Sequence, residues 1–344
     1  MADRYVDPTL STGANDGSNK TGDAWWTLQD AIDGTNSTVP QPGETVYCLH
    51  TNSPDESLSA TIAFAGIKGT ADGHIRFIGC TGAGWAVDGT RYELDFGASA
   101  VDGVTFNDTD TITFENFEVE SSVGSGAYDG INFITSSSQE MSLVNCYIHG
   151  WTGNGVEGAS RSISLGIYGC HITDNDEYGI STISNDLSLV GCSIHGNTDG
   201  GVKCYTTVLY GCAIYENTGY GVYGVAGVQT IINSVMADNT GATADGVYIA
   251  GSYGALYGCR LTGNGRYGLN VHDSDFARVM GCFFDSNTTA ATLGEVVVIS
   301  PDGGSGWMDT SGGDADHGYI DRATDDYNLD PDEASMYSKA LVLE

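Results

Sequence analysis

The sequence predicts an all-β fold, a single-stranded parallel β-helix with a short capping helix near its N-terminus. Three observations predict it: a bend residue that recurs at a fixed place, alternating apolar positions after each bend, and a column of asparagines further on. The repeats are about 20 to 25 residues long. A coil of this length cannot bury its apolar face alone, so we expect neighbouring coils to stack about 4.8 Å apart.

The bend is predicted from the residue that precedes each position of a cysteine-containing column. This residue is always Gly or Asn, the two residue types that best tolerate left-handed backbone. Its nine members are Gly79, Asn116, Asn145, Gly169, Gly191, Gly211, Asn233, Gly258 and Gly281. From Asn145 onward the intervals are 24, 22, 20, 22, 25 and 23 residues, so only the loops vary in length.

The column after the bend and the position two residues further on are small or apolar, whereas the residue between them varies freely. This period of two predicts a strand with one buried face. Cysteines occupy the column in six coils: Cys146, Cys170, Cys192, Cys212, Cys259 and Cys282. We interpret them as small buried hydrophobic residues with free thiols, because parallel Cβ vectors oppose disulfide formation.

Asparagines recur five residues after the cysteine column. The members are Asn175, Asn197, Asn217, Asn239, Asn264 and Asn287. Buried amides are tolerated when they are hydrogen-bonded, so a ladder of amides that bond along the stack is the favoured interpretation. The alternative is that each asparagine was selected separately for a turn.

The N-terminal part, residues 1–45, is expected to be an entry segment and cap. Trp25–Ile32 is expected to form a short amphipathic helix with Asp23 as its N-cap, and Thr45–Leu49 the first strand. Solenoid ends need such caps because they expose strand edges.

The β-helix is expected over residues 46–300, with a projecting loop within about 81–113. Residues 301–344 lack the repeat, and their first part, residues 301–318, is rich in Gly and Asp. They are expected to form an irregular C-terminal cap or an oligomerisation or attachment segment.

The net charge of −33 makes nucleic-acid binding improbable on physical grounds, because phosphates would be repelled. Aspartate supplies most of the acids and lysine is scarce. This bias favours adaptation to high salt, where a carboxylate surface stays hydrated and its self-repulsion is screened. A generally acidic extracellular protein is the alternative. The first residues lack the basic and apolar regions of a signal peptide, and no apolar run is long enough to span a membrane.

With these columns, the chain resembles the right-handed parallel β-helix superfamily with the pectate-lyase-like fold. Three N-terminal stretches look like the entry segment of such proteins: Tyr5-Val6-Asp7-Pro8, Trp26–Ile32 and Pro42–Tyr47. The stretch Asp326–Pro331 looks like their closing segment. The resemblance implies right-handed coils. Its members include polysaccharide lyases, galacturonases, epimerases and viral tailspikes, so the fold alone does not give a function.

No catalytic set stands out, and we predict no catalytic, cofactor-binding or metal-binding residue. Asn197-Thr198-Asp199 matches a galacturonase-like motif, but Asn197 belongs to the asparagine column and the partner motifs are missing. A lyase site would require a basic residue beside a cluster of acids. No evident Asp cluster adjoins any of the four arginines of the central coils, Arg161, Arg260, Arg266 and Arg278. His149 and His195 share a column but lie two coils apart, too far for one zinc ion.

Tyr178, Tyr220 and Tyr267 are candidate glycan contacts. They share the position before a recurrent glycine, together with Asp245. Aromatic side chains along a solenoid face can stack on the apolar faces of sugar rings. Ordinary surface aromatics of a β-sheet are the alternative interpretation.

Two functions remain open. The favoured one is non-enzymatic: a virion surface protein such as a capsid turret or decoration, spike or fibre of a tailed virus, most simply one infecting a haloarchaeon. It would present a rigid β-helix for attachment to a host glycan or glycoprotein, as a trimer or five-fold oligomer bound to other virion proteins. The alternative is a secreted or tailspike enzyme, a lyase or glycosidase, that degrades polysaccharide. No cofactor is expected, although the acidity would allow bound Ca²⁺, Mg²⁺ or Na⁺.

Overall fold

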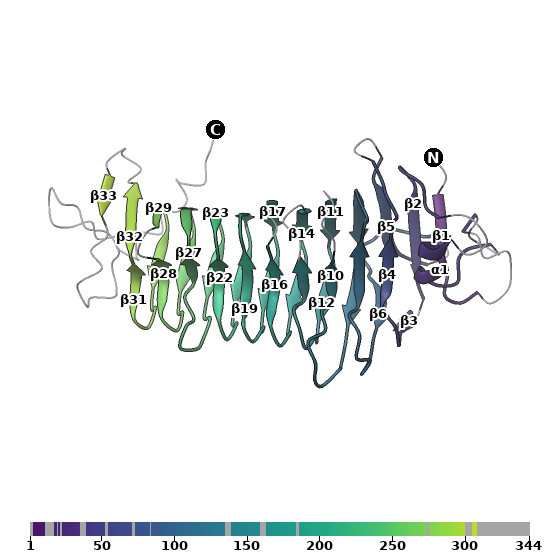
Figure 1. Ribbon diagram of the computed structural model, residues 1–344, viewed down its shortest axis with the longest axis horizontal. Helices are drawn as coiled ribbons and strands as arrows, with labels where there is room; N and C mark the ends of the chain where they lie inside the picture. Colours follow the sequence, from purple (N-terminus) through teal and green to yellow (C-terminus); the bar gives the residue numbers. More distant parts are fainter. Residues whose placement is uncertain are drawn as a thin grey trace. The chain divides into compact units, whose positions relative to one another are not determined.

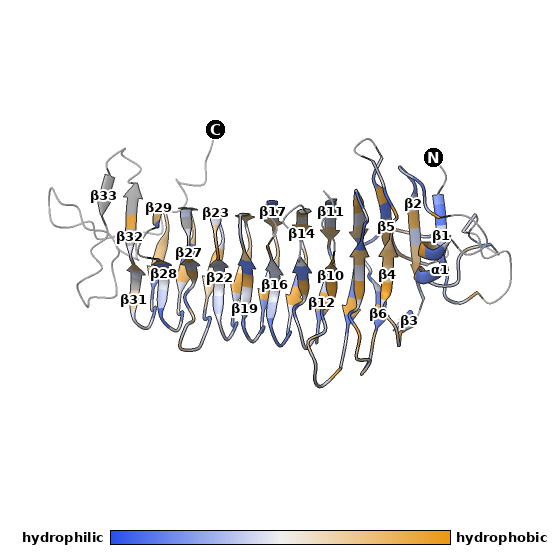
Figure 2. Cartoon of the chain, in the orientation of Figure 1, coloured by the Kyte–Doolittle hydropathy of each residue, from blue (hydrophilic) through white to orange (hydrophobic). Residues whose placement is uncertain are grey.

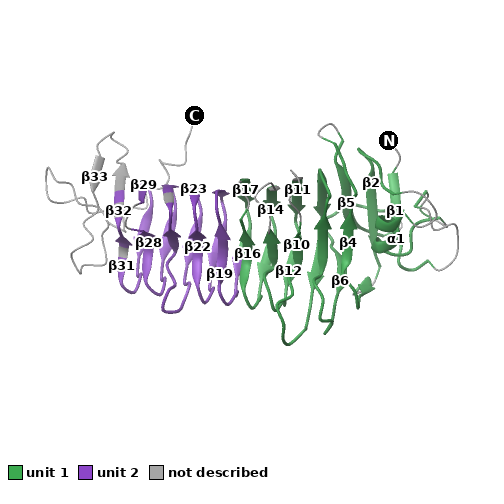
Figure 3. Cartoon of the chain, viewed as in Figure 1, with its two compact units in different colours: residues 1–193 green, residues 194–344 purple. Residues whose placement is uncertain are grey.

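The computed structural model describes residues 3–10, 17–18, 20, 23–34, 39–51, 54–70, 73–82, 84–134, 139–158, 163–183, 186–272, 275–299 and 305–307. The chain divides into two compact units, residues 1–193 and 194–344, coloured green and purple in Figure 3. The boundary falls within strand β18 (Ser193–His195). Each unit contains strands of three sheets, which we call sheets A, B and C.

In the first unit the strands of each sheet lie side by side and parallel (Figure 1). Sheet A contains β1 (Asp3–Val6), β2 (Thr45–His50), β5 (Ile75–Thr81), β8 (Ile112–Glu115), β11 (Gln139–Val144), β14 (Ile163–Tyr168) and β17 (Asp186–Val190). Sheet B contains β3 (Glu56–Ser57), β6 (Tyr92–Asp95), β9 (Phe117–Glu120), β12 (Tyr147–His149) and β15 (His171–Thr173). Sheet C contains β4 (Ile62–Ala65), β7 (Val104–Asn107), β10 (Ile131–Phe133), β13 (Val156–Gly158) and β16 (Tyr178–Thr182).

The second unit repeats this arrangement. Sheet A contains β20 (Thr207–Tyr210), β23 (Gly227–Ile232), β26 (Ser252–Tyr257), β29 (Phe276–Met280), β32 (Glu295–Ile299) and β33 (Ser305–Trp307). Sheet B contains β21 (Ala213–Tyr215), β24 (Val235–Ala237), β27 (Arg260–Thr262) and β30 (Phe283–Asp285). Sheet C contains β19 (Gly200–Cys204), β22 (Tyr220–Gly224), β25 (Val247–Ile249), β28 (Tyr267–Val271) and β31 (Ala290–Leu293). The last strand, β33, pairs antiparallel with β32.

The predicted parallel β-helix is therefore confirmed. Each full coil runs through a strand of sheet A, a bend, a strand of sheet B, a turn and a strand of sheet C. Equivalent residues of successive coils pair in register, for example Leu143 with Ile167 and Ile148 with Ile172. These four side chains are buried, which places the apolar face of each strand inside the coil. Figure 2 shows this hydrophobic character plainly on β2 and β4.

The bends between sheets A and B have the predicted backbone in eight of nine cases. The two asparagines Asn145 and Asn233 have φ of 50° and 48°, and Gly211 has φ of 63°. The prediction is wrong for Gly79, which lies inside the continuous strand β5. Glycine is needed there for another reason, because a Cβ atom would collide with the backbone carbonyl oxygen of Asn116 in the next coil.

The asparagine column lies in the turn between sheets B and C. In the second unit its members form a hydrogen-bonded chain: the Nδ2 of each donates to the Oδ1 of the next, at 3.0 Å from Asn197 to Asn217 and 2.9 Å from Asn264 to Asn287. In the first unit the Oδ1 of Asn175 accepts from the backbone N–H of Trp151. Glycines leave room for the chain, since a Cβ atom on Gly221 would lie 3.0 Å from the Nδ2 of Asn239.

All nine cysteines are buried and carry free thiols, including Cys48 and Cys204 outside the column. Instead of bridging, most of the thiols donate to backbone carbonyl oxygens. The Sγ of Cys192, for example, donates to the carbonyl oxygen of Ile167 at 3.2 Å. Burial raises the pKa of Cys204 to about 12, so this thiol stays protonated.

The prediction for the N-terminal helix needs correction. The helix α1 spans Leu28–Asp33, with Thr27 rather than Asp23 as its N-cap. Trp25 is extended instead, because it pairs with Val6 beside β1, a strand that the sequence analysis did not predict. Residues 81–113, within which a projecting loop was predicted, contain the strands β6 and β7 and the segments that connect them.

The segment between β5 and β6 packs inward through Trp85, which is 7% exposed and contacts Leu49 and Cys80. At the other end, the predicted C-terminal cap lies outside the described residues, apart from β33.

Candidate functional site

The outward face of sheet B in the first unit carries a register-aligned group of charged side chains. Glu93 of β6 pairs with Glu118 of β9, and Asp95 with Glu120. In the next coil, Glu120 of β9 pairs with His149 of β12. Because strand side chains alternate, Glu118 and Glu120 both point outward while Val119 between them is buried.

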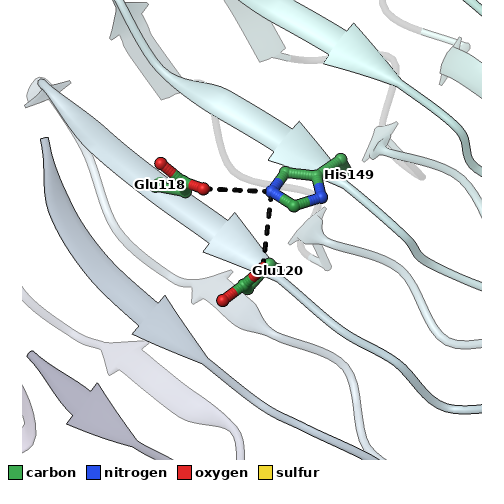
Figure 4. A group of neighbouring side chains, drawn as sticks. All are labelled: Glu118, Glu120 and His149. Carbon is green, nitrogen blue, oxygen red and sulfur yellow. Dashed lines mark hydrogen bonds and ion pairs between the residues drawn. The ribbon is translucent and has the colours of Figure 1, made fainter. Parts of the chain in front are cut away.

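His149 joins the two glutamates into a triad (Figure 4). Its Nε2 lies 3.2 Å from a carboxylate oxygen of Glu118 and 3.6 Å from one of Glu120. The three atoms all lie within 4.8 Å of one another. The side chains are 20–34% exposed, so solvent reaches the group from one side.

Neighbouring groups fix this triad and set its charge. The ring of Tyr147 stacks on that of His149 with centroids 4.1 Å apart, and the guanidinium of Arg91 lies 5.5 Å from the Tyr147 ring. Burial raises the pKa of Glu120; His149 lowers it, and Asp95, Glu118 and Glu93 raise it further. The triad is thus half-buried and rich in negative charge.

The sequence analysis did not single out Glu118 and Glu120. It compared His149 with His195, which lies in the second unit, where it stacks on Tyr215 at 4.6 Å. The signal was present when the coils are aligned with one another, because Glu120 occupies the column of His149 in the preceding coil. It was missed because only histidines were compared within that column.

A cluster of three tyrosines lies on the outward face of sheet C in the second unit. The rings of Tyr220 and Tyr248 stack with centroids 5.3 Å apart at an interplanar angle of 17°, and Tyr223 lies 5.0 Å from Tyr220 and 5.3 Å from Tyr248. Tyr223 and Tyr248 are register partners on β22 and β25. We call these residues the tyrosine trio. All three are half-buried, so part of each ring faces solvent.

A half-buried ion pair lies beside the trio. The carboxylate of Asp245, fully buried, accepts from the Nε of Arg266 at 2.7 Å and from the Nδ2 of Asn270 at 2.7 Å. The Arg266 guanidinium also lies 5.2 Å from the Tyr267 ring. The sequence analysis placed Arg266 outside any evident Asp cluster, and the structure gives it one carboxylate partner, Asp245. The pair links adjacent coils of the second unit.

The structure separates the three predicted glycan contacts. Tyr178 begins β16 in the first unit, where its backbone N–H donates to the Oδ1 of Asn154. Tyr267 faces Arg266, and only Tyr220 belongs to the trio. Tyr223 and Tyr248 were missed because they stand two residues after the recurrent glycine, at a position that varies between coils.

A second acidic group lies on sheet C of the first unit. The Oδ1 of Asp129 accepts from the backbone N–H of Asn154 at 2.8 Å, and Asn132 donates to both Asp102 and Asp129. Burial raises the pKa of Asp129 to about 6, and the charges of Asp102 and Glu177 contribute to the increase. Its carboxylate is satisfied by neighbouring amides, which indicates a structural role.

The motif that resembled a galacturonase site serves the scaffold. Asn197 is fully buried in the asparagine chain and cannot reach a substrate. Arg260 and Arg278 lie over aromatic rings, at 5.6 Å from Phe283 and 5.9 Å from Tyr253, and Arg161 lies outside the described residues. No helix in the part of the chain that the structure describes has the length and apolar character needed to cross a bilayer.

Comparisons with known proteins agree with this architecture. Among solved structures, the chain is similar to pectate lyase Pel9A, with 16% identity and a TM-score of 0.57 over 85% of this chain and 78% of that one. It is also similar to the ORF18 protein of Geobacillus virus E2, with 16% identity and a TM-score of 0.58 over 90% of this chain and 65% of that one. A third similar structure is the enzymatically active domain of tailspike protein 2 from bacteriophage CBA120. It has 12% identity and a TM-score of 0.56 over 87% of this chain and 47% of that one.

At these identities the likeness establishes the fold alone, and no curated protein sequence matches the chain. A family model, by contrast, matches directly. The model described as "Right handed beta helix region" matches residues 65–207 and 102–240, which together span just over half of the chain. The chain therefore belongs to the right-handed β-helix family.

Proposed function

We propose that this protein is a virion surface protein that presents a rigid β-helix for attachment to a neutral polysaccharide of the host surface. The observation that carries the proposal is the tyrosine trio. Its rings are close-packed and partly exposed on one sheet face, and two of them, Tyr223 and Tyr248, are register partners. Sugar rings expose apolar C–H faces, and aromatic rings held in a fixed array offer a matching surface at low entropic cost.

The polar surroundings of the trio suit hydroxyl groups. Lys203 of β19 is the register partner of Tyr223, and the phenol groups of the trio both donate and accept hydrogen bonds. Burial raises the pKa values of Tyr220 and Tyr248, so these phenols keep their protons at neutral pH. The net charge of −33 disfavours an acidic polysaccharide, which supports a neutral one.

The setting on a virus particle rests on other grounds. Similar solved structures include proteins of a Geobacillus virus and of a bacteriophage, and the latter is a tailspike. Such a protein would act as a closed homo-oligomer, a trimer or a five-fold assembly, attached to other virion proteins. The acidity supports a virus of a host that grows in high salt.

Binding measurements on purified host-surface polysaccharide test the role of the trio. Tyr223→Ala and Tyr248→Ala should each weaken binding by about 5- to 30-fold, as for aromatic anchors at interfaces. Tyr210→Ala is the matched control, because Tyr210 is 49% exposed on sheet A of the same unit. Equal affinity of all variants would refute the contact, and immunogold labelling that leaves virions bare would refute the location.

The triad of Glu118, Glu120 and His149 favours a second candidate, a polysaccharide-degrading enzyme. A half-buried carboxylate of raised pKa beside a histidine offers a pair of groups suited to general acid–base catalysis. The carboxylate oxygens lie within 4.8 Å of one another, closer than the pair of an inverting glycosidase. Release of oligosaccharides by the wild type, but not by Glu120→Gln, would establish this activity and exclude a purely adhesive role.

A further inference from the structure

We propose that Glu118, Glu120 and His149 form a binding site for a divalent transition-metal ion of the zinc type. The proposal is independent of the attachment function, because the triad lies in the first unit and the tyrosine trio in the second. The sequence analysis predicted no metal-binding residue, so the proposed site is an addition from the structure. The argument rests on the geometry, the rigidity and the charge of the triad.

The spacing of the three ligand atoms fits a metal ion. Bonds from zinc to nitrogen or carboxylate oxygen are about 2.0–2.2 Å long, so neighbouring ligand atoms lie about 3.4 Å apart in a tetrahedral site. The observed distances from the Nε2 of His149 are 3.2 Å to Glu118 and 3.6 Å to Glu120. The carboxylate oxygens lie within 4.8 Å of each other, so small rotations about the side-chain bonds would close the site.

The backbone holds these ligands in place. Glu118 and Glu120 project from the same face of β9, and His149 projects from the paired strand β12 (Figure 4). Tyr147 covers one face of the imidazole. A site built on paired strands loses little entropy when the ion binds, since its ligands are already aligned.

The surface around the triad carries an excess of negative charge. Glu93 and Asp95 are the register partners of Glu118 and Glu120, so four carboxylates gather around one histidine. A divalent ion bound by the triad would compensate this excess of negative charge.

The donor set selects the class of ion. One imidazole nitrogen with two carboxylate oxygens suits zinc and its neighbours, whereas Ca²⁺ takes six to eight oxygens and Mg²⁺ prefers oxygen ligands and water. Three protein ligands with 20–34% exposed side chains leave at least one coordination position open to water or to a ligand oxygen.

Calorimetric titration of the chelator-treated full chain with Zn²⁺ tests the site, with Co²⁺ absorption as a second readout of ligand geometry. The wild type should bind one equivalent more tightly than any other, and Ca²⁺ should not compete. His149→Gln, Glu118→Gln and Glu120→Gln should each weaken this site by at least about tenfold. His195→Gln is the matched control, because His195 occupies the same column without these glutamates.

His149→Cys separates ligation from folding, since a thiolate also binds zinc and should restore the tight site. Thermal melts confirm that each variant is folded before titration. Unchanged Zn²⁺ binding by His149→Gln, or a wild type without a saturable equivalent, would overturn the proposal. Oligosaccharide binding by the trio variants is read separately, so failure of the metal site leaves the attachment function untouched.

Discussion

The Nδ2 of Asn217 donates a 3.0 Å hydrogen bond to the Oδ1 of Asn239, its counterpart one coil further along the second unit. The same amide donates to the backbone carbonyl oxygens of Ile194 and Tyr215, and its Oδ1 accepts from Asn197. Each buried amide therefore satisfies polar groups of three coils. The chain of asparagines ties each coil to both of its neighbours.

Replacing Asn217 with alanine should be costly, because it removes the acceptor of the buried backbone N–H of Asn197, one acceptor of the Asn197 amide and the side-chain donor to Asn239. We expect the free energy of unfolding to fall by roughly 2–3 kcal/mol. Urea denaturation followed by circular dichroism measures this loss. Thr218→Ala, at the exposed neighbouring position, should change stability by less than about 0.5 kcal/mol. Equal effects of the two substitutions would argue against the ladder as a source of stability.

The bend residue Gly211 should accept asparagine but not valine. Its φ is 63° and nothing lies near a Cβ atom built on it, while the asparagine in the same column of the next coil, Asn233, has φ of 48°. We expect Gly211→Asn to cost little and Gly211→Val about 1–2 kcal/mol or more, because a β-branched residue is strained in left-handed backbone. Thermal melts of the two variants compare them. A valine variant as stable as the asparagine variant would mean that the bend can adopt another conformation.

Asp129 should make the protein less stable as the pH rises from about 4 to about 6. Its pKa in the folded state is raised to about 6, so the folded chain binds this proton more tightly than the unfolded chain does. The stabilising contribution is complete below the unfolded pKa and is lost as the pH passes the folded one. The difference in unfolding free energy between the wild type and Asp129→Asn, measured over this range, should follow that curve.

Asp88 provides the control with the opposite sign. Hydrogen bonds from Thr81 and Thr90 lower its pKa, so its contribution is present at neutral pH and disappears in acid. A difference curve of the same sign for Asp129→Asn and Asp88→Asn would contradict the assignment.

Raising NaCl from low to molar concentration should raise the melting temperature. Glu93 and Glu118 are register partners, as are Asp95 and Glu120, and the repulsion between such partly exposed carboxylates is screened by salt. The double variant Glu93→Gln, Asp95→Asn should gain less from salt than the wild type. Melting temperatures that stay constant from low to molar salt would rule out the proposed adaptation to high salt.

The repeat made most of the fold predictable from the sequence. Left-handed bends need Gly or Asn, and each strand needs alternating apolar positions, so both leave columns that can be recognised. Gly79 shows the limit of this logic, because a glycine required for close packing against Asn116 cannot be distinguished from one required for a bend. Trp25 shows another limit, since its pairing with Val6 overrides the local preference for helix.

The candidate sites were harder to predict, because outward residues follow no repeat. Glu120 and His149 contact each other only because β9 and β12 are neighbours, and Tyr223 and Tyr248 only because β22 and β25 are. Once the register of the coils is known, these pairs follow directly. Sequence columns thus need to be compared between residue types and not only within one type.

The register pairing of successive coils has a consequence for the evolution of this surface. Bends, inward side chains and the asparagine chain fix the backbone, so outward positions such as Tyr223 and Tyr248 can change with little effect on stability. Each substitution changes one side chain on a surface whose neighbouring strands are about 4.8 Å apart. Specificity for a polymeric ligand can therefore change one coil at a time, while the backbone beneath it stays constant.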